Sequence, residues 1–483
     1  MPPEQPIEQT LNQAHTPLVD CLYECATRSN AAFYTPGHKR GQGISDRHRQ
    51  LFGDHVFRAD LPELPELDNL FAPEGVIQQA QILAAEAFGA ERTWFLANGS
   101  TCGIEAAILA TCGPGDKIIL PRNVHTSAIS GLILSGAVPV YVQPSYQADW
   151  DMPMQSEAQS IEAALEAHLD AKAVLLVSPT YQGICSDLEA IAHLTHQRNI
   201  PLIVDEAHGP HFAFHAQLPP SAMSAGADIA VQSAHKVLSA FTQAALLHTQ
   251  GDRINHNRLN RCLQLTQSTS PSYLLLGSLD AARHQMATEG EVLMSRTLAI
   301  ADHARSELGK LSGLKILPAS DRTRLTVNVS DLGLTGFEAD EILHAQFSVT
   351  AELPSLQSLT FIISLGNTKN DIQRLIAAFK SLCERSKSSE VPQPVSPPPL
   401  FTTKTALSPR DSFYAPTQIV SIQAAPGHIC AETICPYPPG IPTLLPGEQI
   451  TKDAIAYLQT LISQGAILTG CQDKTLQTIV VTA

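Results

Sequence analysis

The sequence predicts an α/β protein whose large domain contains a mostly parallel sheet and is followed by two smaller α+β units. From about Gly75 to Thr249, short apolar runs alternate with helical patterns, as they do in βαβ units. From about Tyr273 to Ser381, long helical patterns surround only a few apolar runs. A stretch rich in Pro and Ser, Ser386–Leu400, then separates this region from the C-terminal part of the chain.

The elements follow in order along the chain. In the large domain, the apolar runs predict strands at Thr93–Ala97, Lys117–Leu120, Val138–Val142, Ala173–Ser178, Leu202–Val204, Ile229–Val231 and Ala244–His248. The intervening patterns predict helices that include Gly75–Phe88, Ser100–Thr111, His125–Leu134 and Asp187–Arg198. The small domain is expected to contain strands at Arg324–Val329 and Thr360–Leu365.

These elements give a predicted division of the chain into five segments. Residues 1–74 form an N-terminal arm with helices, 75–272 a large cofactor-binding domain, and 273–385 a small α+β domain. Residues 386–401 form a linker, and 402–483 a C-terminal α+β domain.

Composition limits the function classes that fit. A formal charge of −15 argues against a nucleic-acid partner, which requires clustered Lys and Arg. No apolar stretch is long enough to span a membrane, and the polar, acidic N-terminus lacks a signal-peptide pattern. The ten cysteines contain no C-x-x-C pair, which argues against a zinc site. We therefore expect a cytoplasmic protein with no metal site and no membrane or nucleic-acid partner.

The first candidate site follows the strand expected at Thr93–Ala97. Gly99, Ser100 and Thr101 open the next helix, where backbone N–H groups and hydroxyls can hold a phosphate. An ordinary helix cap would have the same sequence. His125 opens a later helix in the same way, and its ring could lie across a bound cofactor.

A carboxylate and a lysine complete the pattern. Asp205 ends an apolar strand, where a buried carboxylate needs a cationic partner such as a pyridine nitrogen, a metal ion or an Arg. The small residue Ala207 beside it would let a flat ring approach. Lys236 lies between two apolar strands and follows Ser233 and His235; burial would lower its proton affinity, as Schiff-base formation requires. The four features together predict a pyridoxal phosphate (PLP) site.

Eight motifs, in order, extend this prediction to a family. They are TPGHKRG (Thr35–Gly41), LPELDNLFAPEGVIQQAQ (Leu64–Gln81), FLANGST (Phe95–Thr101), PRNVHTS (Pro121–Ser127), SPTYQG (Ser178–Gly183), DEAHG (Asp205–Gly209), SAHK (Ser233–Lys236) and PPGIPTLLPGE (Pro438–Glu448). With these motifs the chain resembles the ornithine/lysine/arginine decarboxylases in their short form, which have an aspartate-aminotransferase-like fold (fold type I). Larger family members often have DSAW where this chain has DEAHG.

The resemblance implies roles for the residues singled out above. Lys236 would bond to PLP, Asp205 would pair with its ring nitrogen, and His125 would stack on the ring. Gly99, Ser100, Thr101, Ser233 and His235 would lie at or near the phosphate, and Ala207 would pack against the other ring face. Lys236 or His235 would return a proton to the substrate. The family also implies a homodimer or a higher homo-oligomer whose active site draws residues from both subunits.

The expected reaction is decarboxylation of a basic L-amino acid, arginine or lysine before ornithine, which would feed polyamine metabolism. Candidates for contact with the substrate are Glu66, Asp68, His208 and Glu448. Each of the three carboxylates could equally be a solvated or helix-capping residue. The alternatives are another fold-type-I PLP reaction, such as transamination or a lyase reaction, and a catalytically inactive paralogue with a regulatory or binding role.

Overall fold

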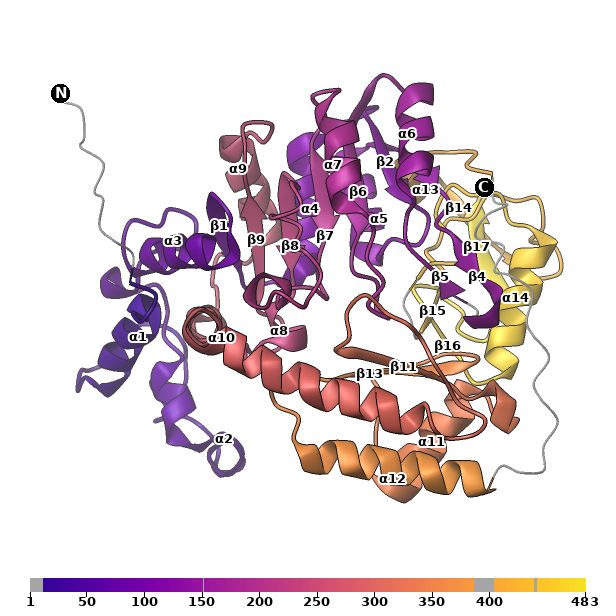
Figure 1. The fold of residues 1–483 in the computed structure, drawn as a ribbon. Helices are drawn as coiled ribbons and strands as arrows, with labels where there is room; N and C mark the ends of the chain where they lie inside the picture. The colour runs from indigo at the N-terminus through magenta and orange to yellow at the C-terminus, as the bar shows by residue number, and fades with distance from the viewer. Residues whose placement is uncertain (1–11, 151, 386–403, 438–440) are drawn as a thin grey trace.

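The computed structural model describes residues 12–150, 152–385, 404–437 and 441–483 (Figure 1). The linker predicted at 386–401 lies outside the described residues, as do the first eleven residues of the arm. Within the described part of the chain, no helix is both long enough and apolar enough to cross a lipid bilayer.

The large domain is built on a seven-stranded sheet in the order β1-β9-β8-β7-β6-β2-β3. Strand β9 is antiparallel to both of its neighbours, whereas the other pairs are parallel, so the expectation of a mostly parallel sheet is confirmed. The strands are β1 (Arg92–Leu96), β2 (Lys117–Pro121), β3 (Val138–Val142), β6 (Ala171–Val177), β7 (Leu202–Asp205), β8 (Ile229–Gln232) and β9 (Ala245–Thr249). Each expected strand is present, with ends within two residues of the prediction.

Helices cover both faces of this sheet. Successive strand residues point to opposite faces, so Leu175 belongs to the core under α4 (Gly99–Thr111), α5 (Thr126–Ser135) and α9 (His256–Thr266). Its neighbour Leu176 belongs to the core under α6 (Ala158–Ala167) and α7 (Leu188–His196). Burial on both faces explains why these strands appear in the sequence as continuous apolar runs.

All four predicted helix starts need a correction of one residue, namely those at Gly75, Ser100, His125 and Asp187. His125 and Asp187 precede α5 and α7 as N-caps, and their side chains accept hydrogen bonds from the backbone N–H groups of Ser127 and Ala190. Asp is a common residue at this position, whereas His is not. The difference places the His125 ring at the mouth of the helix, not on its face.

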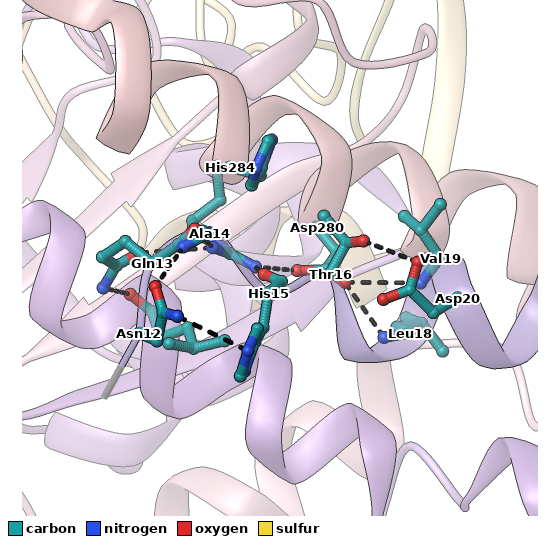
Figure 2. A network of polar contacts seen from close by, with 12 residues as sticks. Asn12, Gln13, Ala14, His15, Thr16, Leu18, Val19, Asp20, Asp280 and His284 are labelled. Atoms are coloured by element: carbon teal, nitrogen blue, oxygen red, sulfur yellow. Dashed lines mark hydrogen bonds and ion pairs between the residues drawn. The ribbon is translucent and has the colours of Figure 1, made fainter. Parts of the chain in front are cut away.

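The N-terminal helices pack against the long helix α10 (Tyr273–Leu308). They are α1 (Pro17–Thr27), α2 (Asp46–Ala59), the 3-10 turn η1 (Pro65–Leu67) and α3 (Val76–Phe88). Figure 2 shows the buried carboxylate of Asp280 in α10, which accepts hydrogen bonds from the backbone N–H groups of Leu18 at 3.0 Å and Val19 at 3.3 Å. Asp280 therefore satisfies the first turn of α1, where N–H groups lack partners within the helix.

The second half of α10 packs under the small domain, so one helix serves two cores. This domain has a four-stranded antiparallel sheet in the order β10-β11-β13-β12. Its elements are β10 (Lys315–Ile316), β11 (Arg324–Asn328), α11 (Gly336–Phe347), β12 (Leu353–Pro354), β13 (Ser358–Ile362) and α12 (Lys369–Arg385). The strand expected at Thr360–Leu365 begins and ends earlier, because β11 pairs with β13 only from Arg324↔Ile362 to Asn328↔Ser358.

The C-terminal unit has its own apolar core, which includes Ile434, Leu444 and Leu458. It contains two strand pairs, β14–β17 and β15–β16. Its elements are α13 (Pro409–Tyr414), β14 (Thr417–Ser421), β15 (Cys435–Tyr437), α14 (Lys452–Ser463), β16 (Ile467–Thr469) and β17 (Thr478–Thr482). Figure 1 shows this unit beside the open end of the sheet domain and the small domain, in yellow.

Candidate active site

A cavity lies at the carboxyl ends of the parallel strands, where ligands bind in open α/β sheets. The large domain supplies a polar floor: Ser100, Asn123, His125, Thr180, Tyr181, Asp205, Ala207, His208 and Lys236. The small and C-terminal domains supply a mainly apolar roof: Phe337, Leu353, Ser355, Leu356, Pro436, Ile441, Thr443, Tyr457 and Leu461. The terms floor and roof refer to these two sets below.

One end of the floor is the N-terminus of α4. Asn98, at the N-cap position, makes no side-chain capping bond, so the first N–H groups of this helix have no side-chain cap. Gly99 has a φ of +78°, which lets the chain turn into the helix at a conformation that other residues rarely adopt. Ser233 Oγ donates to Ser100 Oγ at 2.8 Å, while the neighbouring Thr101 is exposed and does not line the cavity. Backbone donors and hydroxyls at a positive helix end suit a phosphate.

Asp205 is the last residue of β7, and only 7% of its surface is exposed. Its Oδ1 accepts one hydrogen bond, from the backbone N–H of Ala207 at 3.2 Å, and the side chain faces the cavity. Burial raises the pKa of Asp205, while the charges of His125 and Lys236 and the Ala207 N–H oppose that rise. A cationic ligand in the cavity would stabilise the ionised carboxylate.

Lys236 extends into the same cavity from the short helix α8 (Ala234–Val237). Its Nζ lies 3.0 Å from His208 Nε2 and 5.4 Å from the centre of the Tyr181 ring. Burial lowers the pKa of Lys236, and the attraction of Asp205 opposes that shift. A buried amine with a lowered pKa is suited to act as a nucleophile.

His125 also lines the cavity. Its Nδ1 accepts a hydrogen bond from the backbone N–H of Ser127 at 3.2 Å, so the proton of the neutral ring belongs on Nε2. Burial lowers the pKa of His125, the charge of Asp205 opposes this, and that of Lys236 adds to it. A neutral imidazole is therefore the form that this site favours.

Several residues proposed from the sequence lie outside the cavity. His235 turns away, and its Nδ1 lies 3.1 Å from the carbonyl oxygen of Ala244. The carboxylates proposed to hold the distal end of a substrate have partners elsewhere in this chain. Glu66 is exposed and pairs with Arg28 at 2.5 Å, and Asp68 accepts backbone N–H bonds at the start of α3. Sequence spacing alone could not distinguish these helix-capping and surface roles from a role in the cavity.

The third of these carboxylates, Glu448, holds the roof in place. It forms a buried, bidentate ion pair with Arg122, at 2.8 and 2.9 Å, and does not line the cavity. Arg122 also donates to the carbonyl oxygens of Pro442 and Thr443. These bonds attach the loop that carries Thr443, a residue lining the cavity, to the large domain. His208, the fourth candidate for substrate contact, does line the cavity, but its Nε2 faces Lys236.

Sequence reasoning missed several functional positions. Thr180 and Tyr181 follow β6 and could have been found by the rule that located Asp205, because they also come directly after an apolar strand. Arg324 and the apolar roof gave no such signal. They belong to other domains and reach the site only through tertiary packing.

Comparison with known proteins identifies the family. Residues 16–328 match the major domain of the Orn/Lys/Arg decarboxylases, and residues 400–475 match their C-terminal domain. The chain belongs to the Orn/Lys/Arg decarboxylase family. It is 39% identical over 480 residues to the arginine decarboxylase of Bacillus subtilis, covering 97% of this chain and 98% of that protein. It is 38% identical over 486 residues to the arginine decarboxylase of Bacillus anthracis, covering 97% of both.

Solved structures agree with this fold. The lysine decarboxylase of Francisella novicida has a TM-score of 0.84 at 22% identity, covering 97% of this chain and 81% of that one. An alanine–glyoxylate aminotransferase from Nostoc has a TM-score of 0.54 at 18% identity, covering 65% of this chain and 88% of that one. The predicted aspartate-aminotransferase-like fold is thus confirmed.

Family membership makes this decarboxylase a PLP-dependent enzyme that acts on amino acids, as the sequence predicted. The donor set fits PLP. The cavity offers uncapped helix N–H groups at Gly99 and Ser100, a carboxylate at Asp205 that lacks a cation in hydrogen-bond contact, and the amine of Lys236.

Proposed function

We propose that this protein decarboxylates L-arginine, with L-lysine next and L-ornithine last in order of preference, and that the amine product feeds polyamine metabolism. The observation that carries the substrate order is the 39% identity to an arginine decarboxylase over nearly the full length of both chains. A cytoplasmic location fits the ten cysteines, all of which are free thiols.

The floor and the adjoining N-terminus of α4 would together bind PLP. At that helix end, the backbone of Gly99, Ser100 and Thr101 would hold the phosphate, together with the hydroxyls of Ser100 and Ser233. Lys236 would bind the cofactor covalently, and His125 and Ala207 would pack against its ring. Asp205 would keep the ring nitrogen protonated. When bound, PLP acts as an electron sink for the electrons released as CO2 leaves.

The protein's own residues would orient the substrate, exclude water from the cavity and transfer a proton. The apolar roof, with Phe337 and Leu461, would exclude water and hold the α-carboxylate in a non-aqueous environment. The released amine of Lys236 would return a proton to the substrate Cα, because its Nζ lines the cavity. His235 is the weaker candidate for this step, because its Nδ1 faces the Ala244 carbonyl oxygen.

A homodimer would complete the site. Among the described residues that line the cavity, Asp205 is the only carboxylate, so these residues offer no second acidic partner for the distal guanidinium or ammonium group of a basic substrate. We infer that the second copy of the chain supplies that partner. Sedimentation of the holoenzyme tests this assembly, and a monomer with full activity would contradict it.

A substrate panel tests the proposed reaction. Purified holoenzyme is given arginine, lysine and ornithine separately, CO2 release is measured, and the amine products are identified by mass. We expect kcat/KM to be highest for arginine. Preferred turnover of lysine or ornithine would overturn the substrate order, and keto-acid formation without CO2 would indicate a transaminase.

A further inference from the structure

The small domain places a buried arginine against a histidine of the floor. Arg324, the first residue of β11, has no exposed surface. Its Nη2 donates to the carbonyl oxygen of His208 at 2.9 Å and lies 3.5 Å from the Nδ1 of the same residue. The nearest carboxylate, that of Asp321, lies 4.0 Å from Arg324 Nη1 and 3.2 Å from His211 Nε2. Arg324 is therefore shared between His208, which accepts its shorter hydrogen bond, and Asp321, with which it forms a longer ion pair.

This contact favours one position for the proton of the His208 ring. A guanidinium can only donate hydrogen bonds, so the nitrogen facing it must present its lone pair. Burial is the largest cause that lowers the pKa of His208 well below its ordinary value, and the charge of Arg324 acts in the same direction, so the site favours the neutral ring. With a lone pair on Nδ1, the single proton of the neutral ring lies on Nε2.

The tautomer of His208 in turn constrains Lys236. His208 Nε2 lies 3.0 Å from Lys236 Nζ. If Nε2 donates in this hydrogen bond, Nζ must accept, and an ammonium group has no lone pair with which to do so. We propose that Arg324 is a positioning residue that fixes the proton of His208 on Nε2 and thereby keeps Lys236 a neutral, nucleophilic amine.

The other charged groups around Lys236 act on its pKa in both directions, so a contact that favours the neutral amine has an effect. The carboxylates of Asp205 and Glu352 favour the ammonium form of Lys236, whereas burial and Arg324 disfavour it. His125 and His235 also lie close enough to interact with this cluster. Arg324 is the cation of the small domain that lowers the pKa of Lys236. Packing of the small domain against the large domain is therefore linked to the protonation state of the lysine. This inference rests on the proposed role of Lys236 as the cofactor lysine.

The test measures how fast the full-length protein, stripped of cofactor, captures PLP as a function of pH. Absorbance follows attachment, and borohydride reduction traps it. Arg324→Gln removes the charge and offers His208 Nδ1 an acceptor, so we expect the pH midpoint for capture to rise by about one unit. At pH values well below the midpoints of both proteins, Arg324→Gln should capture PLP about tenfold more slowly than the wild type. Arg324→Lys keeps the charge and should leave the midpoint near that of the wild type.

Arg305→Gln is the matched control. Arg305 donates to the carbonyl oxygens of Arg322 at 3.1 Å and Leu317 at 2.9 Å, and to the backbone carbonyl oxygen of Arg324. Its loss removes a neighbouring charge and a backbone contact of β11 but leaves the Arg324 guanidinium in place, so it controls for a general disturbance of this strand. Its variant should keep the wild-type midpoint. An unchanged midpoint in Arg324→Gln, or an equal shift in Arg305→Gln or Arg324→Lys, would overturn the inference.

A second measurement does not depend on how the Arg324 variants fold. Nitrogen NMR of 15N-histidine-labelled wild-type protein, with the His208 signals assigned by their loss in His208→Gln, reports the tautomer directly. A proton on Nε2 supports the inference, and a proton on Nδ1 overturns it. Failure of the proposed function gives a different result, because trapped PLP would then persist in Lys236→Ala.

Discussion

The floor and the roof of the cavity differ in origin and in chemistry. The floor residues Asp205, His125 and Lys236 lie at or after the ends of strands of one sheet and are polar. Asp205 is buried, the other two are half-buried, and their charges oppose the rise in the pKa of Asp205 that burial causes. The roof residues Phe337 and Leu461 come from two other domains and are apolar. Floor variants should therefore change cofactor chemistry, whereas changes at the roof should alter substrate binding and stability.

The largest effect is expected at the floor lysine. Lys236→Ala removes the amine that would bond to PLP, so we expect no borohydride-trappable adduct and no detectable turnover. Mass spectrometry of the reduced protein measures the adduct, and circular dichroism checks the fold. An adduct that survives in this variant would place the covalent attachment elsewhere.

The next largest effect is expected at the floor carboxylate. Asp205→Asn removes the negative charge but keeps the shape, and kcat should fall by about 10²- to 10³-fold, the usual cost of losing one electrostatic contact to the reacting group. Steady-state CO2 release measures the fall, and PLP absorbance shows whether cofactor remains bound. A near-normal kcat would contradict the proposed role of Asp205.

The attachment of the roof provides the third test. Glu448→Gln leaves Arg122 buried without its carboxylate, which should lower the free energy of unfolding by about 3 kcal/mol. KM should rise more than kcat falls, because the loop carrying Thr443 loses its anchor to the large domain. Urea unfolding and steady-state kinetics measure the two effects. A loss confined to kcat would mean that the ion pair acts on the floor instead.

The free energy of unfolding should depend on pH through Glu206, the residue after Asp205 of the floor. Burial raises the pKa of Glu206 from 4.5 to about 8, although Gln232 and the Ala222 N–H oppose this. The fold therefore favours the protonated carboxyl, whose stabilising effect is complete below about pH 4.5 and is lost as the pH rises towards about 8. Glu206→Gln cannot ionise, so its free energy of unfolding should fall less between these pH values. Parallel pH profiles for variant and wild type would refute the shift.

The smallest effect is expected from a carboxylate that lies outside the cavity. Glu66 is exposed and pairs with Arg28 on the surface, where ion pairs contribute little. Glu66→Gln should leave KM for arginine within about twofold of the wild-type value and the thermal midpoint unchanged. A KM increase of tenfold or more would indicate that Glu66 reaches a substrate, for instance in the second subunit of a dimer.

Much of the fold and the floor could be predicted from the sequence. The apolar runs located every strand of the large sheet within two residues, and Asp205 was found because it ends such a run. Helix ends were located about as closely, although His125 proved to be an N-cap and not a helical residue. Glu448 lies in one of the family motifs, but spacing does not reveal that Arg122 binds its carboxylate.

The sequence by itself determined the sheet, the cofactor and part of the floor, because parallel strands bring their carboxyl ends to one edge regardless of their separation in the chain. Only the tertiary structure decided how the floor is tuned and covered. Arg324 meets His208 across 116 residues of chain, and Phe337 meets Leu461 across two domains. No local pattern encodes such contacts, because they depend on how separately formed cores pack against one another.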